Sequence, residues 1–231
     1  MTMNDRPVIL LAAHGERGGA ANNERLAGIV DQVAQALPEA DVGSVLVNVE
    51  GVIERAVQAC GTRRLIVLPL LFSDGFFFER RLRPFVAGPG RTLAQPMALW
   101  PGFAPFLADN LALRTISHAA DPRVVLLAHG SKQTGRSAAC ARIVAQHMQA
   151  RYGRIEVAFL EEPPFAGDVI AAAEAPWSAV GLFLGDGMHG GTDFDVLVST
   201  APRPPVAAFT AGELTSLPAL VVAEAQARLA A

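Results

Sequence analysis

The sequence predicts an α/β fold made of two similar domains, each with a small parallel sheet flanked by helices. Three observations predict it: apolar segments that are continuous rather than alternating, helical patterns between them, and a repeat of the whole arrangement in the second half of the chain. Continuous apolar strands belong to sheets that are covered on both faces. Strands that alternate with helices form parallel βαβ units, whose ligands bind at the carboxyl ends of the strands.

Six segments have the length and composition of buried strands. They are VILLAA (8–13), SVLVNV (44–49), LIVLPLLF (65–72), VVLLA (124–128), IEVAFL (155–160) and AVGLFL (179–184). The segments between them have apolar residues three and four positions apart, which predicts amphipathic helices. These segments are NNERLAGIVDQVAQAL, VIERAVQAC, SAACARIVAQHMQARY and DVIAAAEA.

The two halves of the chain match each other in order and spacing. VILLAAHGERG matches VVLLAHGSKQTG, EADVGSVLVNVE matches GRIEVAFLEE, and LIVLPLLFSDGFF matches AVGLFLGDGMH. A repeat that extends along the whole chain indicates an internal duplication. We therefore expect an N-terminal domain at 1–118 and a C-terminal domain at 119–231, with a hinge at 121–123 and a ligand cleft between the domains.

Composition excludes several classes of protein. The net charge is −3 with no block of like charge, which argues against a nucleic-acid partner. The start, MTMNDRP, has no apolar signal core, and no apolar segment approaches the roughly 18 residues that span a bilayer. These features predict a cytoplasmic protein with no membrane partner. Cys60 and Cys140 have no CxxC spacing and are expected to be small buried packing groups.

Three side chains in the second half are expected to meet at the carboxyl edge of one sheet. His129 ends the first strand of this half, Glu161 ends the second, and His189 follows the third. Two imidazoles and a carboxylate suit a divalent ion such as Co²⁺, Fe²⁺ or Zn²⁺, with positions left open for a substrate. The matching residues of the first half are His14, Asn48 and Phe77, so the set is incomplete there. The C-terminal domain is therefore the predicted active domain, and His14 is interpreted as a loop residue.

These motifs also resemble a known family. An apolar strand followed by AHGS, a second strand ending in FLE, and a third strand leading to a glycine-flanked histidine, all duplicated in one chain, resemble the class II tetrapyrrole chelatases in their long two-domain form. This family includes the sirohydrochlorin cobalt- and ferrochelatases. The resemblance implies two chelatase-like domains and an enzyme of cobalamin or siroheme biosynthesis. Such an enzyme inserts Co²⁺ or Fe²⁺ into sirohydrochlorin or a related tetrapyrrole without ATP or a nucleotide cofactor.

The resemblance also implies roles for individual residues. His129 and His189 would bind the metal and accept protons, and Glu161 would be the acidic metal-binding residue. This chain departs from the family pattern in two places, with GGTD after the second histidine and with Phe77 in the first half.

Further residues are candidates for contact with the tetrapyrrole. Glycines allow a flat ring to approach the backbone closely, an aromatic side chain offers an apolar face, and basic side chains pair with the carboxylates of sirohydrochlorin. The candidates are Gly187 and Gly190 for close approach, Phe77 for the apolar face, and Lys132 and Arg136 for the carboxylates, with Arg80, Arg81 and Arg83 beside the equivalent loop of the first half.

Two alternatives remain open. GSKQTGRS is one residue away from a phosphate-binding P-loop, but Arg136 stands where the lysine should be. A non-catalytic tetrapyrrole or metal carrier on the same fold is the stronger alternative. Because the duplication supplies two lobes in one chain, we also expect a monomer with pseudo-twofold symmetry.

Overall fold

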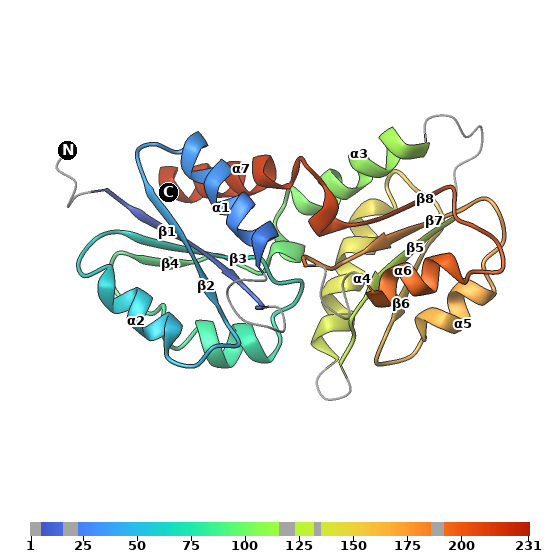
Figure 1. Ribbon diagram of the computed structural model, residues 1–231, viewed down its shortest axis with the longest axis horizontal. Coiled ribbons are helices and arrows are strands. Elements are labelled where there is room, and N and C mark those ends of the chain that lie inside the picture. The colour runs from blue at the N-terminus through green and yellow to red at the C-terminus, as the bar shows by residue number, and fades with distance from the viewer. Residues whose placement is uncertain (1–5, 16–22, 116–122, 132–134, 186–191) are drawn as a thin grey trace. The chain divides into compact units, whose positions relative to one another are not determined.

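The computed structural model describes residues 6–15, 23–115, 123–131, 135–185 and 192–231 (Figure 1). It confirms the predicted α/β fold with two similar halves. Two four-stranded sheets are present in this part of the chain, with strand orders β2-β1-β3-β4 and β6-β5-β7-β8, and every strand pair is parallel. Among the helices of the described residues, none has the length and apolar character needed to cross a membrane.

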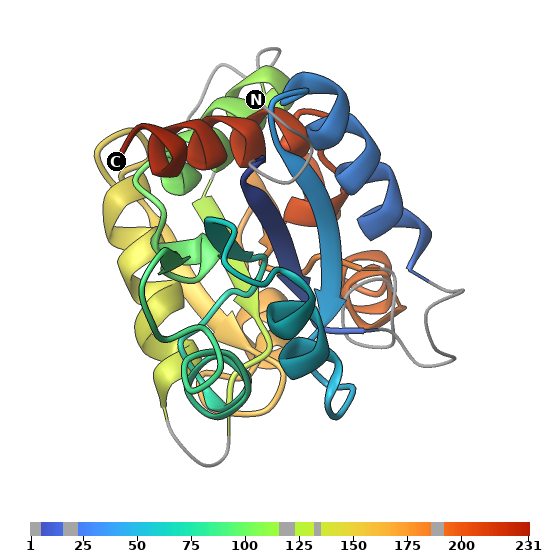
Figure 2. The same ribbon diagram turned by 90° about the vertical axis from the view of Figure 1, so that its left-hand side faces the viewer.

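The first sheet consists of β1 (Val8–Ala13), β2 (Asp41–Leu46), β3 (Leu65–Pro69) and β4 (Arg91–Leu93). Helices α1 (Glu24–Ala36) and α7 (Leu217–Ala230) contact each other and cover one face (Figure 2). The other face is covered by α2 (Val52–Ala59) and by a π-helix, η3 (Phe77–Leu82). All six residues of β1 are buried, as a central strand between two helical layers requires.

The second sheet consists of β5 (Arg123–Ala128), β6 (Ile155–Phe159), β7 (Trp177–Gly181) and β8 (Ala207–Thr210). Helices α3 (Phe103–Thr115) and α4 (Arg136–Met148) contact each other on one face. Helices α5 (Ala166–Ala171) and α6 (Thr192–Ser199) pack on the other. Short 3₁₀ helices, η4 (Met97–Leu99) and η5 (Ala211–Glu213), follow the fourth strand of each sheet.

The compact units of the chain differ from the predicted division at residue 118. One unit contains residues 1–100 together with 215–231, and the other contains residues 101–214. Helix α3 follows the first sheet in sequence but packs in the second unit, and α7 ends the second half but packs in the first. Each half of the chain thus gives its last helix to the other unit.

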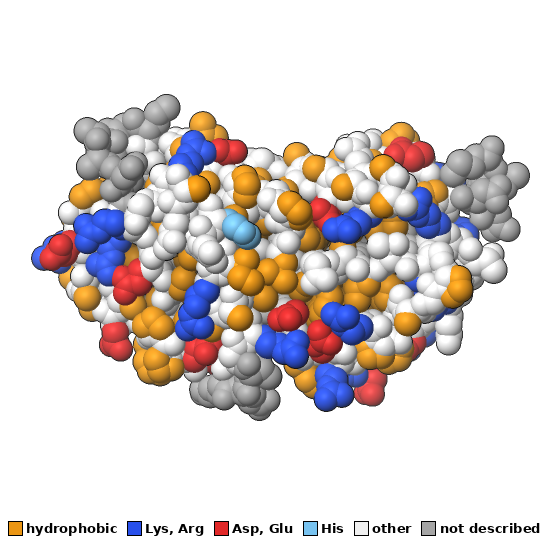
Figure 3. Space-filling model, turned by 180° about the vertical axis from the view of Figure 1, so that it is seen from behind, with side chains coloured by type: hydrophobic (Ala, Val, Ile, Leu, Met, Phe, Trp, Pro, Cys, Tyr) orange, Lys and Arg blue, Asp and Glu red, His pale blue; other side chains and the backbone are white. Residues whose placement is uncertain are grey.

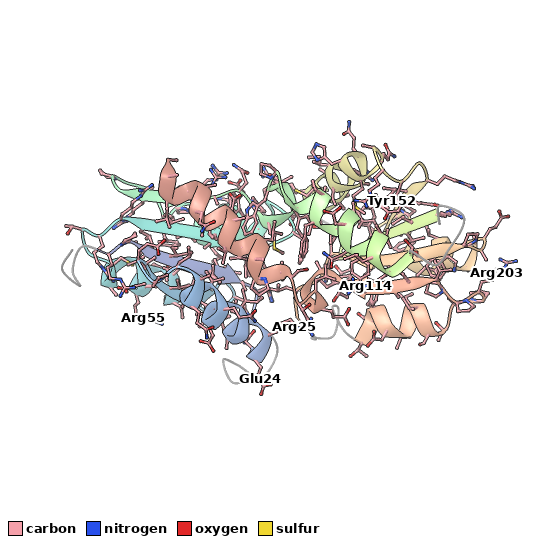
Figure 4. All side chains as sticks on the ribbon, turned by 90° about the horizontal axis from the view of Figure 1, so that it is seen from above. Glu24, Arg25, Arg55, Arg114, Tyr152 and Arg203 are labelled. Atoms are coloured by element: carbon pink, nitrogen blue, oxygen red, sulfur yellow. The ribbon has the colours of Figure 1, made fainter. Side chains whose placement is uncertain are left out.

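Side-chain contacts explain why α3 belongs to the second unit (Figure 4). The Tyr152 hydroxyl donates a hydrogen bond to the carbonyl of Ala108 (3.1 Å), and the Arg114 guanidinium lies 4.7 Å from the centre of the Phe209 ring. In the first unit, Arg64 donates hydrogen bonds to the carbonyls of Arg228 and Leu229 at the end of α7. The sequence pattern of strand followed by helix does not specify which sheet the helix covers. The packing of each half's last helix in the other unit was therefore not predicted.

The two cysteines are free and buried, which confirms their predicted role as packing groups. Burial raises the pKa of the Cys60 thiol, an effect that the nearby Arg63 and Arg91 partly offset. The thiol lies near the carbonyl of Ala56 (3.1 Å), one helical turn earlier.

Candidate functional site

Both sheets place a histidine directly after their first strand. His14 follows β1 and His129 follows β5. The carbonyl of His129 accepts a hydrogen bond from the backbone N–H of Glu161 (3.0 Å), just beyond the end of β6. Two of the three predicted metal-binding residues therefore lie side by side at the carboxyl edge of the second sheet.

His129 and Glu161 are both half-buried, but their side chains are used differently. Nδ1 of His129 lies 3.1 Å from the carbonyl oxygen of Gly130. The Glu161 carboxylate forms no hydrogen bond or ion pair within the described part of the chain. It is thus available to bind an ion at this edge.

A second carboxylate holds the loop after His129. Glu162 accepts a hydrogen bond from the backbone N–H of Ser131 (2.8 Å). Gly130 has a φ of +81°, and a Cβ there would lie 3.0 Å from Cγ of Glu162 and from Cβ of Phe159. The site prediction did not assign Glu162 a role, because nothing in the sequence shows that the residue after Glu161 contacts the loop that follows His129.

The matching loop of the first half is held by an amide. Asn48 Oδ1 accepts the backbone N–H of Gly15 (2.7 Å), and Nδ2 donates to the carbonyl of Gly15 (3.2 Å). His14 is exposed, and its ring meets that of Phe77 edge-on with the ring centres 4.7 Å apart. A phenyl ring has no lone pair for a metal, and the Asn48 amide is already engaged, so this half lacks counterparts of two of the three predicted ligands.

Backbone hydrogen bonds fix the correspondence between the halves. Leu70 donates to the carbonyl of Ala12 (2.8 Å), and Leu182 donates to the carbonyl of Leu127 (2.7 Å). Counting forward by the same number of residues from positions 70 and 182 pairs Phe77 with residue 189. In the first half, the residue at this position contacts the histidine that follows the first strand.

The same comparison pairs Asn48 with Glu161. Val47 donates to the carbonyl of Ala13 (2.9 Å), and Leu160 donates to the carbonyl of Ala128 (3.2 Å). The next residue in each half is Asn48 or Glu161, so Val49 corresponds to Glu162. Thus the loop-holding side chain comes from the first of these two positions in one half and from the second in the other.

His189 lies outside the described residues, as do Lys132, Gly187 and Gly190. Within the described ranges, no group of three or more His, Cys, Asp or Glu side chains could hold a metal ion. The convergence of His189 with His129 and Glu161 therefore stays a prediction.

The other predicted contact residues are exposed or half-buried. Arg136 is the exposed first residue of α4. Phe77 begins η3 beside Phe76, which is 58% exposed. Arg83 forms an ion pair with Glu79 (3.0 Å) and lies over the ring of Phe78. Figure 3 shows that basic and acidic side chains are interspersed on the face drawn there, with no extended area of one sign.

A surface pocket of about 470 Å³ lies at the opposite end of the second sheet, at the amino ends of β5 and β6. Its lining includes Arg123, which forms an ion pair with Glu156, and the exposed Arg154. This pocket is separate from the edge that carries His129, because the strands run between the two.

Comparisons with known proteins bear on the fold. No protein-family model matches the chain, and no curated protein matches it. Among solved structures, CbiX, described as the terminal enzyme for biosynthesis of siroheme in denitrifying bacteria, is 22% identical with a TM-score of 0.79, over 95% of this chain and 98% of that chain. SirB from Bacillus subtilis with Fe³⁺ is 15% identical with a TM-score of 0.72, over 96% and 94%. The sirohydrochlorin chelatase SirB from Bacillus subtilis subspecies spizizenii, in complex with cobalt, is 16% identical with a TM-score of 0.68, over 93% and 91%.

These similarities extend over nearly the whole length of both chains and establish a shared fold. The resemblance predicted from the strand-end motifs is therefore confirmed at the level of the fold.

Proposed function

We propose that this chain, which has the fold of the sirohydrochlorin chelatases, inserts a divalent metal ion into sirohydrochlorin or a related tetrapyrrole without ATP. The ion is Co²⁺ or Fe²⁺, and it is a substrate. The catalytic and metal-binding residues are His129, Glu161 and His189. The observation that carries the proposal is the position of Glu161, whose backbone is hydrogen-bonded to His129 and whose carboxylate has no described partner.

The reaction requires groups that bind the ion and remove protons. Two pyrrole N–H protons leave the ring as the ring nitrogens bind the ion, so one divalent ion replaces two protons and charge is balanced. A neutral imidazole can bind a metal or accept a proton near pH 7, which suits both tasks. The Glu161 carboxylate partly neutralises the ion before the ring nitrogens do so. No bond in this exchange requires nucleotide hydrolysis.

The tetrapyrrole would contact residues of several loops. Gly187 and Gly190 would allow the ring to approach the backbone, Lys132 and Arg136 would pair with its carboxylates, and Phe77 would present an apolar surface. Phe76, next to Phe77, and Arg136 are exposed, which supports their availability for contact with the ring. We further propose that the protein is cytoplasmic. We also propose that it is a monomer, because one chain contains both halves; a stable dimer in light scattering would contradict this.

The test follows the absorption of sirohydrochlorin during incubation with Co²⁺ or Fe²⁺, with and without the protein. We expect the protein to accelerate insertion above the spontaneous rate. His129→Ala should lower the catalysed rate by at least about 100-fold, the usual contribution of a positioned proton acceptor. His14→Ala is the matched control, because this histidine has the same place in the half that lacks the other ligands, and it should retain activity.

Tight binding of sirohydrochlorin without faster insertion would contradict the catalytic proposal and favour a carrier. Equal losses in His129→Ala and His14→Ala would contradict the assignment of the reaction to the second half.

A further inference from the structure

The loop after His129 is held by a carboxylate that the proposed reaction does not use. Oε1 of Glu162 accepts the backbone N–H of Ser131 at 2.8 Å. Hydrogen bonds from an N–H to an ionised carboxylate are short and about twice as strong as those between neutral groups. Glu162 is half-buried, so water screens this contact less than it would on an open surface.

The Ser131 N–H and the Gly130 carbonyl belong to the same planar peptide unit. That carbonyl oxygen lies 3.1 Å from Nδ1 of His129. A carbonyl only accepts hydrogen bonds, so Nδ1 of His129 is the donor. In a neutral imidazole the lone pair is then on Nε2. Glu162 and His129 are thus bound to the two ends of one rigid peptide unit.

This arrangement has a geometric and an electronic effect. Fixing the plane of the peptide fixes the direction of the Gly130 carbonyl, and through it the orientation of the imidazole. A negative charge at the N–H end also polarises the peptide and makes the carbonyl a stronger acceptor. A stronger acceptor at Nδ1 makes Nε2 a better metal ligand, as it does in carboxylate–histidine–metal arrangements.

Gly130 also belongs to this arrangement of Glu162, the peptide unit and His129. Its φ of +81° is a conformation that L side chains rarely adopt, and a Cβ would lie 3.0 Å from Cγ of Glu162. The Glu162 side chain therefore passes directly against this glycine on its way to the Ser131 N–H.

The first half lacks this arrangement. Asn48 accepts the N–H of Gly15, which belongs to the preceding peptide unit, and its own amide donates to the Gly15 carbonyl at 3.2 Å. The same carbonyl lies 2.9 Å from Nδ1 of His14. There a neutral amide shares the acceptor with the histidine and brings no negative charge to the peptide.

We propose that Glu162 is a positioning residue for His129. Acting through the Gly130–Ser131 peptide, it keeps His129 protonated on Nδ1 and strengthens Nε2 as a ligand for the divalent ion. The identity of the ion rests on the proposed function, whereas the effect on the tautomer does not.

The first measurement is the affinity of the full-length protein for Co²⁺ alone, by calorimetric titration. We expect Glu162→Ala to weaken binding by about 10- to 100-fold, the usual loss when a group that supports a metal ligand is removed. Glu162→Gln should lose less, because its amide oxygen can still accept the Ser131 N–H. Asn48→Ala is the matched control, since it removes the equivalent loop contact from the half without the ligand set, and it should leave the affinity unchanged.

The second measurement is the ¹⁵N chemical shift of the His129 ring in the metal-free protein, at alkaline pH where imidazoles are neutral. We expect the Nδ1–H tautomer in the native protein and a mixture of tautomers in Glu162→Ala. A change in folding stability alone would not alter the tautomer of the folded population, so this measurement separates positioning from general stabilisation.

Unchanged Co²⁺ affinity and an unchanged tautomer in Glu162→Ala would overturn the proposal. If that variant does not fold, Glu162→Gln is measured in its place. A several-fold loss of Co²⁺ affinity in Glu162→Gln supports the role of the carboxylate charge, and an unchanged affinity overturns that role. If the native protein does not bind Co²⁺, the proposed function fails, and the tautomer measurement still decides the role of Glu162.

Discussion

The two halves of this chain share a strand order and a histidine at the same strand end, but they hold the loop after that histidine with different chemistry. In the first half, both ends of the Asn48 amide are bound to Gly15. In the second half, Glu162 holds the loop, and the residue that corresponds to Asn48 is Glu161. Moving the loop contact one residue along the chain leaves the earlier side chain available for another task.

The halves also differ after their third strands. The first half continues as the π-helix η3, which begins at Phe77 and carries Arg80 and Arg81, and Arg83 follows directly after it. Position 189 is a histidine, and α6 begins with Thr192, Asp193, Phe194 and Asp195. The two halves therefore differ in local charge and in the residue type at the position that corresponds to His189. Under the proposed function, the ion would bind in the second half only, whereas residues of both halves would contact the ring.

The sharpest way to test this comparison is to mutate the pair Phe77 and His189. His189→Ala should reduce metal insertion by about 100-fold or more, because it removes a proposed ligand and proton acceptor. Phe77→Ala should retain kcat and mainly raise KM for the tetrapyrrole, since its ring offers only apolar surface. Steady-state kinetics of both variants provide the measurement. A similar fall in kcat for the two variants would show that the halves do not divide the task in this way.

The missing ligand set could be rebuilt in the first half. The correspondence of positions predicts that Asn48→Glu, Val49→Glu and Phe77→His together supply a ligand, a new loop contact and a second ligand beside His14. Val49 is 43% exposed, so a glutamate there needs no burial of charge. We expect calorimetry to show a second, weaker equivalent of Co²⁺. The control variant carries Asn48→Glu and Phe77→His but keeps Val49. It should bind less of the second Co²⁺, because it has lost the Asn48 contact to the loop and gained no replacement. A stoichiometry of one in both variants would indicate that further differences separate the halves.

Substituting the loop glycines should also affect the halves differently. Gly130→Ala places a side chain at a φ of +81° and 3.0 Å from two neighbouring side-chain carbons, and should cost about 1–3 kcal/mol of stability. Gly15→Ala should cost less, because Gly15 does not have a positive φ and its closest contact is the movable end of Asn48, at 2.8 Å. Denaturant midpoints compare the two variants. A larger loss for Gly15→Ala would mean that steric contact outweighs backbone strain here.

The smallest expected effect concerns Cys60 in the first half. Because burial raises the pKa of its thiol, the folded state disfavours the thiolate. The protonated thiol contributes to the free energy of unfolding. This contribution is complete below the unfolded pKa, near 9.0, and is lost as pH rises through the higher pKa of the folded state. The free energy of unfolding should thus decline slightly more steeply above about pH 9 in the native protein than in Cys60→Ala. Identical pH profiles would show that Cys60 contributes nothing to this decline.

Much of the fold was predictable because local patterns specify it. Continuous apolar segments marked the three long strands of each sheet, although β2 begins three residues before its predicted start, at Asp41, and β7 begins at Trp177. The fourth strands, Arg91–Leu93 and Ala207–Thr210, were not predicted. Segments of three or four residues at a sheet edge have too few positions to show a pattern.

The sequence by itself determined the duplication, the parallel sheets and the placement of His129 and Glu161 at one strand edge, because hydrophobic periodicity and strand-end position are local properties. Only the tertiary structure decided which of two adjacent glutamates holds the loop and in which compact unit the last helix of each half packs. Both depend on contacts between segments far apart in the chain, such as Glu162 with Ser131 and Tyr152 with Ala108. Neighbouring residues with the same chemistry differ only in the direction in which the folded backbone points them.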